Sequence, residues 1–508
     1  MRNEIKRYYD INYRGFDLPG FRTMSIYQVL SRVVQLFYDG TKRFRPAAIS
    51  ADEMTGLLMD ELSHSKEDTQ ALHGLLRDWI GKRLLLEREG EALGPNPIHY
   101  RTASMYVCDD PEVERSSEML YNILRTDPII RKFFNRYFTP QRDDNAEEEL
   151  LVRLAGRLPL ADEDPARAPE ETNVSICPAF RRMVVDDFRR VFSYSEHLSR
   201  GTFVRLLENL VGLHLATYEM LVTNIVNNFV SRGVFCPQNC PVAPEASDLK
   251  GCFCVDGVFG SSDSKMESFC QVAIRSFTSK IEKHRAFLQN IALMRKLEQY
   301  NGDGFEFLKE PAFKEKPLPA DLLTLKEHPD LDSWLDAESI LLTEEETAGR
   351  KTMFGLLDET EIEPRLRLIS KLLTVLGPAN DANYARRLER MLGYSDGFGL
   401  LASFRGSFMY YLSDKFIGFT VMLATVEKDA AGKYQISKEI SLADYCNFLR
   451  QRYGINVGGR YKGGYPGQGI LRENIAVLHR RLFYMGYVSD PLNRPVNPII
   501  RPDIAIER

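Results

Sequence analysis

Apolar residues recur at helical spacing along most of the chain, and the first such run opens at Ile26 behind a capping box. Two shorter helices are predicted to begin at Ser50 and Ser65. The period then changes, and a turn-rich stretch leads to a returning strand at Ile98–Val107. Three short helices followed by a two-stranded ribbon predict a winged-helix domain over residues 1–110.

The middle of the chain, residues 111–310, is predicted to be a helical domain. An apolar stripe covers residues 119–134, and two longer periodic segments follow at Phe203–Val230 and Met266–Tyr300. Both segments are long enough to pack as an antiparallel helical hairpin. Because four of the eight cysteines lie between them, a cysteine-rich loop is expected at the tip of this hairpin.

Residues 363–508 are predicted to form an α+β module of the helix-turn-helix type. Phe416–Val426 and Tyr434–Ile440 are predicted as two strands joined by a polar turn. Ser441 then caps a helix, and a last amphipathic helix covers residues 471–485. The predicted fold class is therefore mainly α, with a winged helix, a central helical bundle or hairpin, and this C-terminal module.

The composition is that of a soluble globular protein. Of the 508 residues, 44% are hydrophobic and 27% are charged, and the net charge is −5. The longest apolar run is shorter than the roughly 18 residues that cross a bilayer. The first residues lack the apolar core of a secretory signal, and eight cysteines are too few for a disulfide framework. These features predict a cytoplasmic protein of several domains without a membrane segment.

The small net charge conceals an uneven distribution of charge along the chain. Residues 321–364 hold 13 acidic and three basic side chains, whereas residues 450–508 hold four acidic and ten basic ones. The first 49 residues are also basic. We therefore predict an acidic, solvated linker at residues 311–362. The basic ends are expected to contact the phosphates of DNA.

The candidate DNA-binding residues are cations of the two terminal modules. The third predicted helix of the N-terminal module has few cations and several acidic residues, which favours protein docking and leaves DNA contact as the alternative. The glycine-rich loop at residues 458–469 lacks the ending of a nucleotide-binding P-loop and is interpreted as a flexible wing or hairpin. The candidates are Arg77, Lys82, Arg88, Arg460, Lys462, Arg472, Arg480 and Arg481.

A cluster of cysteines is a candidate metal site. Zinc prefers four tetrahedral sulfur or nitrogen ligands, and a loop without a core of its own gains order by binding it. The spacing differs from that of paired zinc knuckles, so unligated thiols are the alternative to a structural zinc ion. The predicted ligands are Cys236, Cys240, Cys252 and Cys254, with Cys270 or His284 as substitutes.

Three common enzyme signatures are absent from the sequence, which contains no Gly-x-Ser-x-Gly elbow, no His-Glu-x-x-His and no kinase loop set. Asp248–Lys250 and Asp263–Lys265 match the short end of a metal-dependent nuclease motif, but such triplets occur by chance. His214 lies on an apolar helix and is interpreted as a satisfied core histidine. Three isolated cysteines are expected to be small buried residues: Cys108, Cys177 and Cys446.

The N-terminal region carries a family resemblance in the segments Tyr27–Arg45, Ser50–Met54 and Leu75–Trp79. These segments resemble the opening winged helix of kleisin-like subunits, which serve bacterial SMC-type complexes that include plasmid- and phage-defence machines. The order of a winged helix, a helical middle and a terminal module is similar too. The resemblance implies a protein partner, an ATPase of SMC type. Accessory subunits of other bacterial defence systems, including those linked to DNA modification, are an alternative resemblance.

These patterns together predict a non-enzymatic scaffold or adaptor subunit of a multi-protein bacterial complex that acts on DNA in anti-phage or plasmid defence. The N-terminal apolar stripe would dock a helix of an ATPase or effector partner, and the basic ends would approach DNA. Two alternatives stay open. One is a nuclease-like DNA-processing enzyme whose site is assembled from residues distant in sequence, and the other is a DNA-binding regulator.

Overall fold

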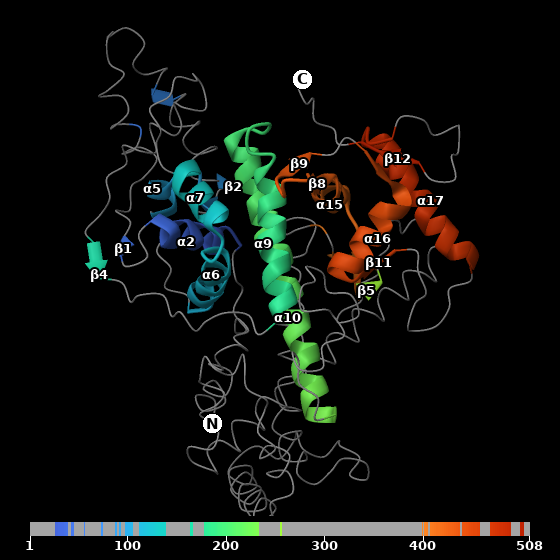
Figure 1. Cartoon of the computed structure of the whole chain (residues 1–508), viewed down its shortest axis with the longest axis horizontal. Coiled ribbons are helices and arrows are strands. Elements are labelled where there is room, and N and C mark those ends of the chain that lie inside the picture. Colours follow the sequence, from blue (N-terminus) through green and yellow to red (C-terminus); the bar gives the residue numbers. More distant parts are fainter. Residues whose placement is uncertain are drawn as a thin grey trace, which may run out of the picture.

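The chain is mainly α-helical, and a computed structural model places its helices around one long central helix (Figure 1). The structure describes residues 26–38, 42–44, 55, 73–74, 87–88, 91–92, 97–104, 111–138, 163–165, 177–232, 255–256, 399, 401–404, 407–436, 439–457, 468–488 and 498–501. The predicted second long helix at residues 266–300 and the acidic linker at residues 311–362 lie outside these ranges.

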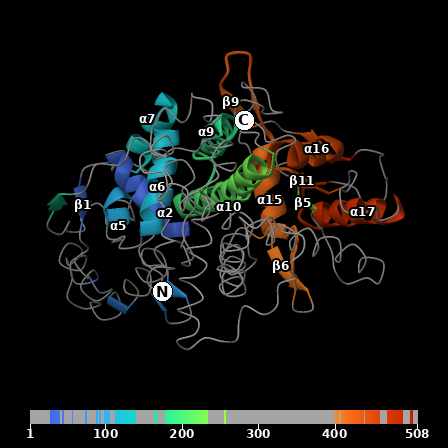
Figure 2. The ribbon, with the colours of Figure 1, turned by 90° about the horizontal axis from the view of Figure 1, so that it is seen from below.

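The helices form three groups that lie side by side in Figures 1 and 2. The N-terminal group consists of α2 (Ile26–Tyr38), α5 (Tyr100–Ser104), α6 (Pro111–Leu124) and α7 (Pro128–Tyr137). The central pair consists of α9 (Pro178–Phe192) and α10 (Arg200–Arg232), and the C-terminal group of α15 (Asp414–Ala424), α16 (Leu442–Tyr453) and α17 (Gln468–Tyr484). No helix in the described ranges is both long and apolar enough to cross a membrane.

The described strands are short and pair in twos. The antiparallel pairs are β1 (Lys42–Phe44) with β4 (Glu163–Pro165), β2 (Glu87–Arg88) with β3 (Glu91–Ala92), β6 (Leu401–Phe404) with β7 (Ser407–Tyr410), β8 (Val426–Lys428) with β9 (Tyr434–Ile436), and β10 (Ile440–Ser441) with β12 (Ile499–Ile500). The parallel pair is β5 (Val255–Asp256) with β11 (Ile455–Asn456).

The first predicted helix is confirmed as α2, and the rest of the chain buries it. The side chains of Val29, Leu30 and Val33 are fully buried, and α2 packs against α5, α6, α7 and α10. Arg32 is buried as well, and it pairs with Glu114 of α6 through two contacts of 2.8 and 3.1 Å. The prediction that this stripe docks a partner helix is therefore wrong, because the chain's own helices cover it.

The prediction of a strand at Ile98–Val107 is wrong, because Tyr100–Ser104 forms the helix α5. Thr102 Oγ1 donates to the carbonyl of His99 at 2.8 Å and accepts from the N–H of His99 at 3.2 Å. Such local side-chain bonds favour a helix start over a strand ladder. The second and third predicted helices lie mostly outside the described residues, so the winged helix stays a prediction.

The apolar stripe at residues 119–134 is divided between α6 and α7. The side chain of Asp127 accepts the N–H groups of Ile129 and Ile130 at 3.0 and 3.1 Å, and Pro128 takes the first position of α7. An acidic N-cap followed by proline is a strong signal for a new helix. The break redirects the chain, and α7 packs on α2 and α9.

Aromatic side chains fill the space between α7, α9 and α10. The ring of Phe133 stacks on that of Phe192 with centroids 3.7 Å apart, and the rings of Tyr137 and Phe203 lie 4.9 Å apart. Phe134 is 1% exposed and meets Phe192 edge-on at 5.9 Å. Pairs of this kind add to the stability that burial provides, so the aromatic core fixes α7 on the central pair.

The prediction of a strand at Phe416–Val426 is wrong, because most of this segment lies in α15. Ser413 Oγ caps the helix by accepting the N–H of Phe416 at 3.1 Å. An uninterrupted apolar run suits a buried helix as well as a buried strand. The polar turn after it is confirmed, since β8 and β9 pair across a turn in which Asp429 Oδ1 accepts the N–H of Lys433 at 2.8 Å.

The two predicted C-terminal helices are confirmed as α16 and α17. Ser441 Oγ accepts the N–H of Asp444 at 3.1 Å, as the capping pattern predicts. Gly454, at φ 66°, ends α16 in the left-handed conformation. Leu478 of α17 is fully buried. The loop at residues 458–467 lies outside the described ranges, so the helix-turn-helix arrangement stays a prediction.

We expect Phe134→Ala to lower the free energy of unfolding by about 3–5 kcal/mol, the usual effect of deleting a buried phenylalanine side chain. The matched control is Ile129→Ala on the same helix, because the Ile129 side chain is 56% exposed and its removal should change stability by less than about 0.5 kcal/mol. Chemical denaturation measures both variants. Equal losses would contradict an aromatic core beneath α7.

Candidate functional site

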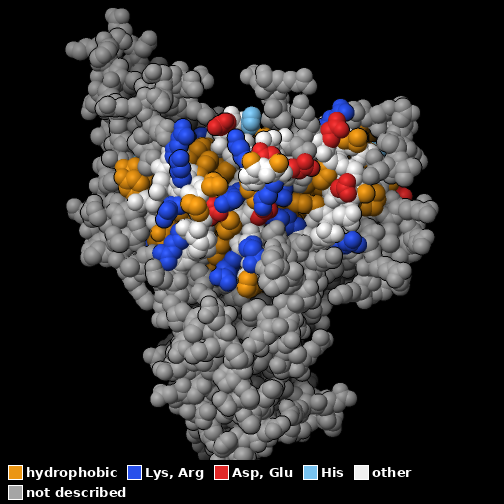
Figure 3. Space-filling view, in the orientation of Figure 1, with side chains coloured by type: hydrophobic (Ala, Val, Ile, Leu, Met, Phe, Trp, Pro, Cys, Tyr) orange, Lys and Arg blue, Asp and Glu red, His pale blue; other side chains and the backbone are white. Residues whose placement is uncertain are grey.

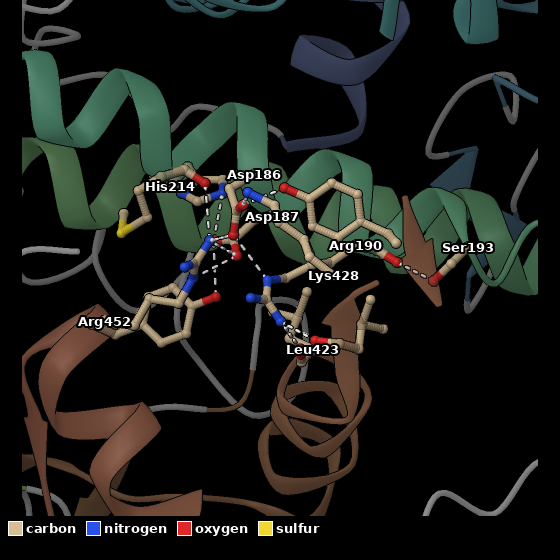
Figure 4. A network of polar contacts seen from close by, with 12 residues as sticks. Asp186, Asp187, Arg190, Ser193, His214, Leu423, Lys428 and Arg452 are labelled. Atoms are coloured by element: carbon tan, nitrogen blue, oxygen red, sulfur yellow. Dashed lines mark hydrogen bonds and ion pairs between the residues drawn. The ribbon is translucent and has the colours of Figure 1, made fainter. Parts of the chain in front are cut away.

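Charged and polar side chains, most of them buried, gather where α9 and α10 meet the C-terminal group of helices (Figure 4). We call this set the buried charge cluster. Its members are Asp186, Asp187 and Arg190 of α9, His214 of α10, Lys428 of β8, Tyr434 of β9, and Arg452 and Tyr453 of α16. Lys428, at the margin, is 51% exposed. Asp187 and Arg452 are 265 residues apart in the sequence, so the cluster joins segments that lie far apart along the chain.

Arg452 links the two neighbouring carboxylates of α9. Its Nε donates to Asp187 Oδ1 at 2.7 Å, and its Nη2 donates to Asp186 Oδ2 at 2.6 Å. Tyr453 donates its hydroxyl to the other oxygen of Asp187 at 2.9 Å. Both oxygens of Asp187 therefore accept hydrogen bonds, which is the pattern of an ionised carboxylate.

Asp186 is also bound from its own helix and from the β8–β9 hairpin. Arg190, one turn further along α9, places Nε 2.9 Å from Asp186 Oδ2. Lys428 Nζ lies 3.0 Å from Asp186 Oδ1, and the hydroxyl of Tyr434 donates to the same oxygen. One carboxylate thus contacts α16 and both strands of the hairpin.

Side chains near the C-terminal end of α9 hold the end of α15. Arg190 Nη1 donates to the carbonyl of Leu423 at 3.1 Å and to that of Val426. The hydroxyl of Tyr194 donates to the carbonyl of Met422 at 2.9 Å. The last carbonyls of a helix have no partner within it, so these donors satisfy groups that burial would otherwise leave unpaired.

Burial and pairing act in opposite directions on the ionisation of the cluster. Burial raises the pKa of Asp187, and the charge of Asp186 adds to this, while Arg452 opposes both. Burial would also raise the pKa of Asp186, but the charges of Arg452 and Arg190 hold that pKa well below its usual range. Burial would lower the pKa of Arg452, yet the charge of Asp187 raises it, so the guanidinium keeps its proton.

The imidazole of His214 is held neutral within the cluster. Its side chain is 0% exposed, and its Nε2 lies 3.4 Å from Asp187 Oδ2. Neither ring nitrogen makes a hydrogen bond in the part of the chain that the structure describes. Burial lowers the pKa of His214 to about 3, and the charge of Arg452 acts in the same direction. The prediction that His214 lies in the core is confirmed, but the prediction that its ring is satisfied is wrong among the described residues.

The cluster contains the residue types of many active sites, but its central side chains are buried and paired with one another. The side chains of Asp187 and Arg452 are 0% and 8% exposed, whereas a catalytic acid or base has to reach a substrate. The carboxylate oxygens are occupied by donors from the same chain. Among the described residues, no group of three or more His, Cys, Asp or Glu side chains is arranged to hold a metal ion.

The structure places two of the candidate DNA-binding side chains. Arg480 is 59% exposed and lies 3.6 Å from Glu473. Arg481 is 16% exposed, and its Nη2 lies 2.6 Å from Asp414 Oδ1, so this cation joins α17 to the start of α15 and is already neutralised. Arg88 and Arg472 belong to β2 and α17. Four candidates lie outside the described residues: Arg77, Lys82, Arg460 and Lys462.

The described cysteines are isolated residues. Cys177 is buried, as predicted, and its Sγ accepts the N–H of Phe180 at 3.4 Å, which caps α9. Cys446 is half-buried, and burial raises the pKa of its thiol to about 12, so the thiol stays protonated at neutral pH. The four predicted zinc ligands, Cys236, Cys240, Cys252 and Cys254, lie outside the described residues, and the zinc site stays a prediction.

A comparison with protein families gives a match to most of the chain, and the matched segment includes both α9 and α16. The family model described as methylation-associated defense system protein MAD7 matches residues 20–491. The chain belongs to this family. No curated protein matches it. Membership makes this MAD7-family chain a component of a defence system, in agreement with the defence role that the sequence predicts.

Sequence reasoning missed the cluster, although the MAD7-family chain carries a faint signal of it. Asp187 falls on the same face of α9 as the buried side chains of Met183, Val184 and Val191. A carboxylate at such a position needs a partner, because burying an unpaired charge is costly. Nothing in the sequence indicates that this partner is Arg452.

We expect Arg452→Met to lower the free energy of unfolding by about 3–5 kcal/mol, because it leaves two buried carboxylates without their shared guanidinium. The matched control is Arg450→Met, an exposed position on the same helix, where the change should stay within about 0.5 kcal/mol. Chemical denaturation of the purified chain measures both.

The double variant D187L/R452M refines this prediction. It removes the carboxylate together with the guanidinium, so it should be more stable than R452M alone. Losses that simply add would contradict a direct interaction between Asp187 and Arg452.

We also expect acid to destabilise the protein through His214. Its pKa is about 3 in the folded chain against 6.5 for a free histidine, so below pH 6.5 the unfolded chain takes up a proton that the folded chain does not. Stability is then lost as the pH falls from 6.5 towards 3, by at most about 1.4 kcal/mol per pH unit.

His214→Leu removes this titratable group and fills the buried position with an apolar side chain. The midpoint of thermal unfolding should fall more steeply between pH 7 and pH 4.5 in the wild type than in H214L. Parallel curves would mean that His214 is not held neutral in the folded state.

Proposed function

We propose that this protein is a non-enzymatic scaffold or adaptor subunit of its defence system, and that it bridges a protein partner and DNA in the bacterial cytoplasm. The observation that carries the proposal is the buried charge cluster, in which Arg452 of α16 binds Asp186 and Asp187 of α9. An adaptor has to hold its contact surfaces at a fixed spacing. Buried, hydrogen-bonded charges favour one arrangement over others because any shift leaves a charge unpaired.

The non-enzymatic part of the proposal rests on access to the same residues. An acid or base that moves a proton must lie within hydrogen-bond reach of a substrate. Asp187 and His214 are 0% exposed, and the oxygens of Asp187 already accept bonds from Arg452 and Tyr453. These side chains support a role in fixing the frame of the molecule.

The protein partner in this proposal is an ATPase or effector of the same defence system. The resemblance of the N-terminal segments to kleisin-like subunits supports an ATPase of SMC type. Because α2 is covered by α5, α6, α7 and α10, the partner would bind an exposed face of the chain. In this proposal, a structural zinc ion in the cysteine-rich loop would stabilise the scaffold and take no part in catalysis.

The decisive experiment separates a structural role of the cluster from a catalytic one. In cells that carry the whole defence system, R452M is expected to abolish protection against phage, and the control R450M is expected to retain it. D187L/R452M regains stability without the charged pair, so it should regain protection as well. A stable double variant that fails to protect would contradict the structural role.

The adaptor role itself is tested by purification of the tagged full-length chain from the same cells. Wild type, R450M and D187L/R452M should recover the same proteins of the system, and R452M should recover less of them. Repeated cleavage or modification of DNA by the purified chain with Mg²⁺ would overturn the adaptor in favour of the nuclease-like alternative.

A further inference from the structure

The helix α7 presents only positive charge to the solvent. Arg131, Lys132, Asn135 and Arg136 are exposed along one side of it, and the helix contains no acidic residue. Figure 3 shows Lys and Arg side chains over the N-terminal group of helices and over the central helices, while the acidic side chains lie mainly over the central and C-terminal elements. This surface stands out in a chain whose net charge is −5.

Contacts on the opposite side hold this basic face in a fixed position. Ile130 and Phe134 of α7 are buried at 0% and 1% exposure, and Phe133 stacks on Phe192. At the end of the helix, Arg200 Nη1 donates to the carbonyl of Tyr137 at 2.6 Å. The basic side chains therefore extend from a helix that is fixed at both ends, since Asp127 caps its start.

Two cations of this face, Arg131 and Lys132, have no acidic partner within the described part of the chain. Asp127, next to α7, is 8% exposed, caps the helix and pairs with Arg189 of α9. The side chains of Arg131 and Lys132 form no ion pair or hydrogen bond with any described residue. Within the described structure, these two cations are available to bind an anion.

The chemistry of the face fits a phosphate backbone better than a protein surface. Guanidinium, ammonium and amide groups are the usual donors to phosphate oxygens. Lys132 and Arg136 are one turn apart, about 6 Å along the axis, so their charges follow a line. The core of a protein interface needs apolar and aromatic anchors, and Ile129 is the only exposed large apolar side chain of this helix.

We propose that the outer face of α7, formed by Arg131, Lys132, Asn135 and Arg136, binds the phosphate backbone of duplex DNA. The proposal rests on the proposed function in that DNA is one of the two bridged partners. It places the contact on the helical core of the molecule, away from the basic ends of the chain. Contacts to phosphate carry no base information, so binding at this face does not depend on sequence.

The experiment measures binding of a fluorescently labelled duplex to the full-length chain by anisotropy, between about 50 and 200 mM salt. R131Q/K132Q removes the two free cations, and K433Q/R450Q is the matched control, because it removes two exposed cations of the C-terminal group. The slope of log affinity against log salt should shrink by about 2 in R131Q/K132Q. It should stay unchanged in the control.

Three outcomes overturn the proposal. The first is a salt slope of R131Q/K132Q equal to that of wild type, and the second is a loss of slope in K462Q/R480Q instead. The third is the loss of a protein partner by R131Q/K132Q with DNA binding unchanged. The last outcome would identify α7 as a docking site for an acidic protein. The adaptor role is tested separately, by recovery of partner proteins and by DNA cleavage. A loss of the predicted DNA contact at α7 is therefore distinguishable from a failure of the adaptor role.

Discussion

The ion pairs of Arg452 with Asp186 and Asp187 join the C-terminal group of helices to α9. Asp186 and Asp187 are neighbours on α9, and two carboxylates in a buried site repel one another unless a cation lies between them. Arg452 supplies that cation from α16, at 2.6 and 2.7 Å. Removal of one partner of a buried ion pair leaves the other charge uncompensated, and this supports the proposal that the cluster fixes the position of the C-terminal group on α9.

Capping residues and hydrophobic periodicity predicted several helices correctly. They gave the wrong element where burial in the folded chain, and not the local pattern, decides between helix and strand. The caps at Ser441 and the periodicity of α2 and α10 led to correct helices. The apolar run at Phe416–Val426 fits a strand and a buried helix equally, and only packing against α9 and α16 decides for the helix. The cluster could not be predicted, because pairing between Asp187 and Arg452 leaves no trace in the spacing of either segment.

Three aspartates, two on α9 and one at the start of α7, lie deeper in the described structure than the cations on the outer face of α7. Asp127, Asp186 and Asp187 are at most 8% exposed, and they are used to cap a helix or to bind cations of the frame. The side chains of Arg131 and Lys132 are exposed to solvent, where an anion can reach them. The net charge of the chain therefore says little about what it attracts, since inward-facing carboxylates cannot screen an outward-facing basic helix.

The separation of 265 residues between Asp187 and Arg452 has a consequence for synthesis of the protein. When α9 leaves the ribosome, Arg452 has not yet been synthesised. Its pairing with Asp186 and Asp187 can form only after nearly nine-tenths of the chain has been translated. At about 5–20 residues per second that delay lasts many seconds. A chain that stops short of α16 leaves Asp186 and Asp187 without the guanidinium of Arg452 and lacks the contact that joins α9 to the C-terminal group of helices.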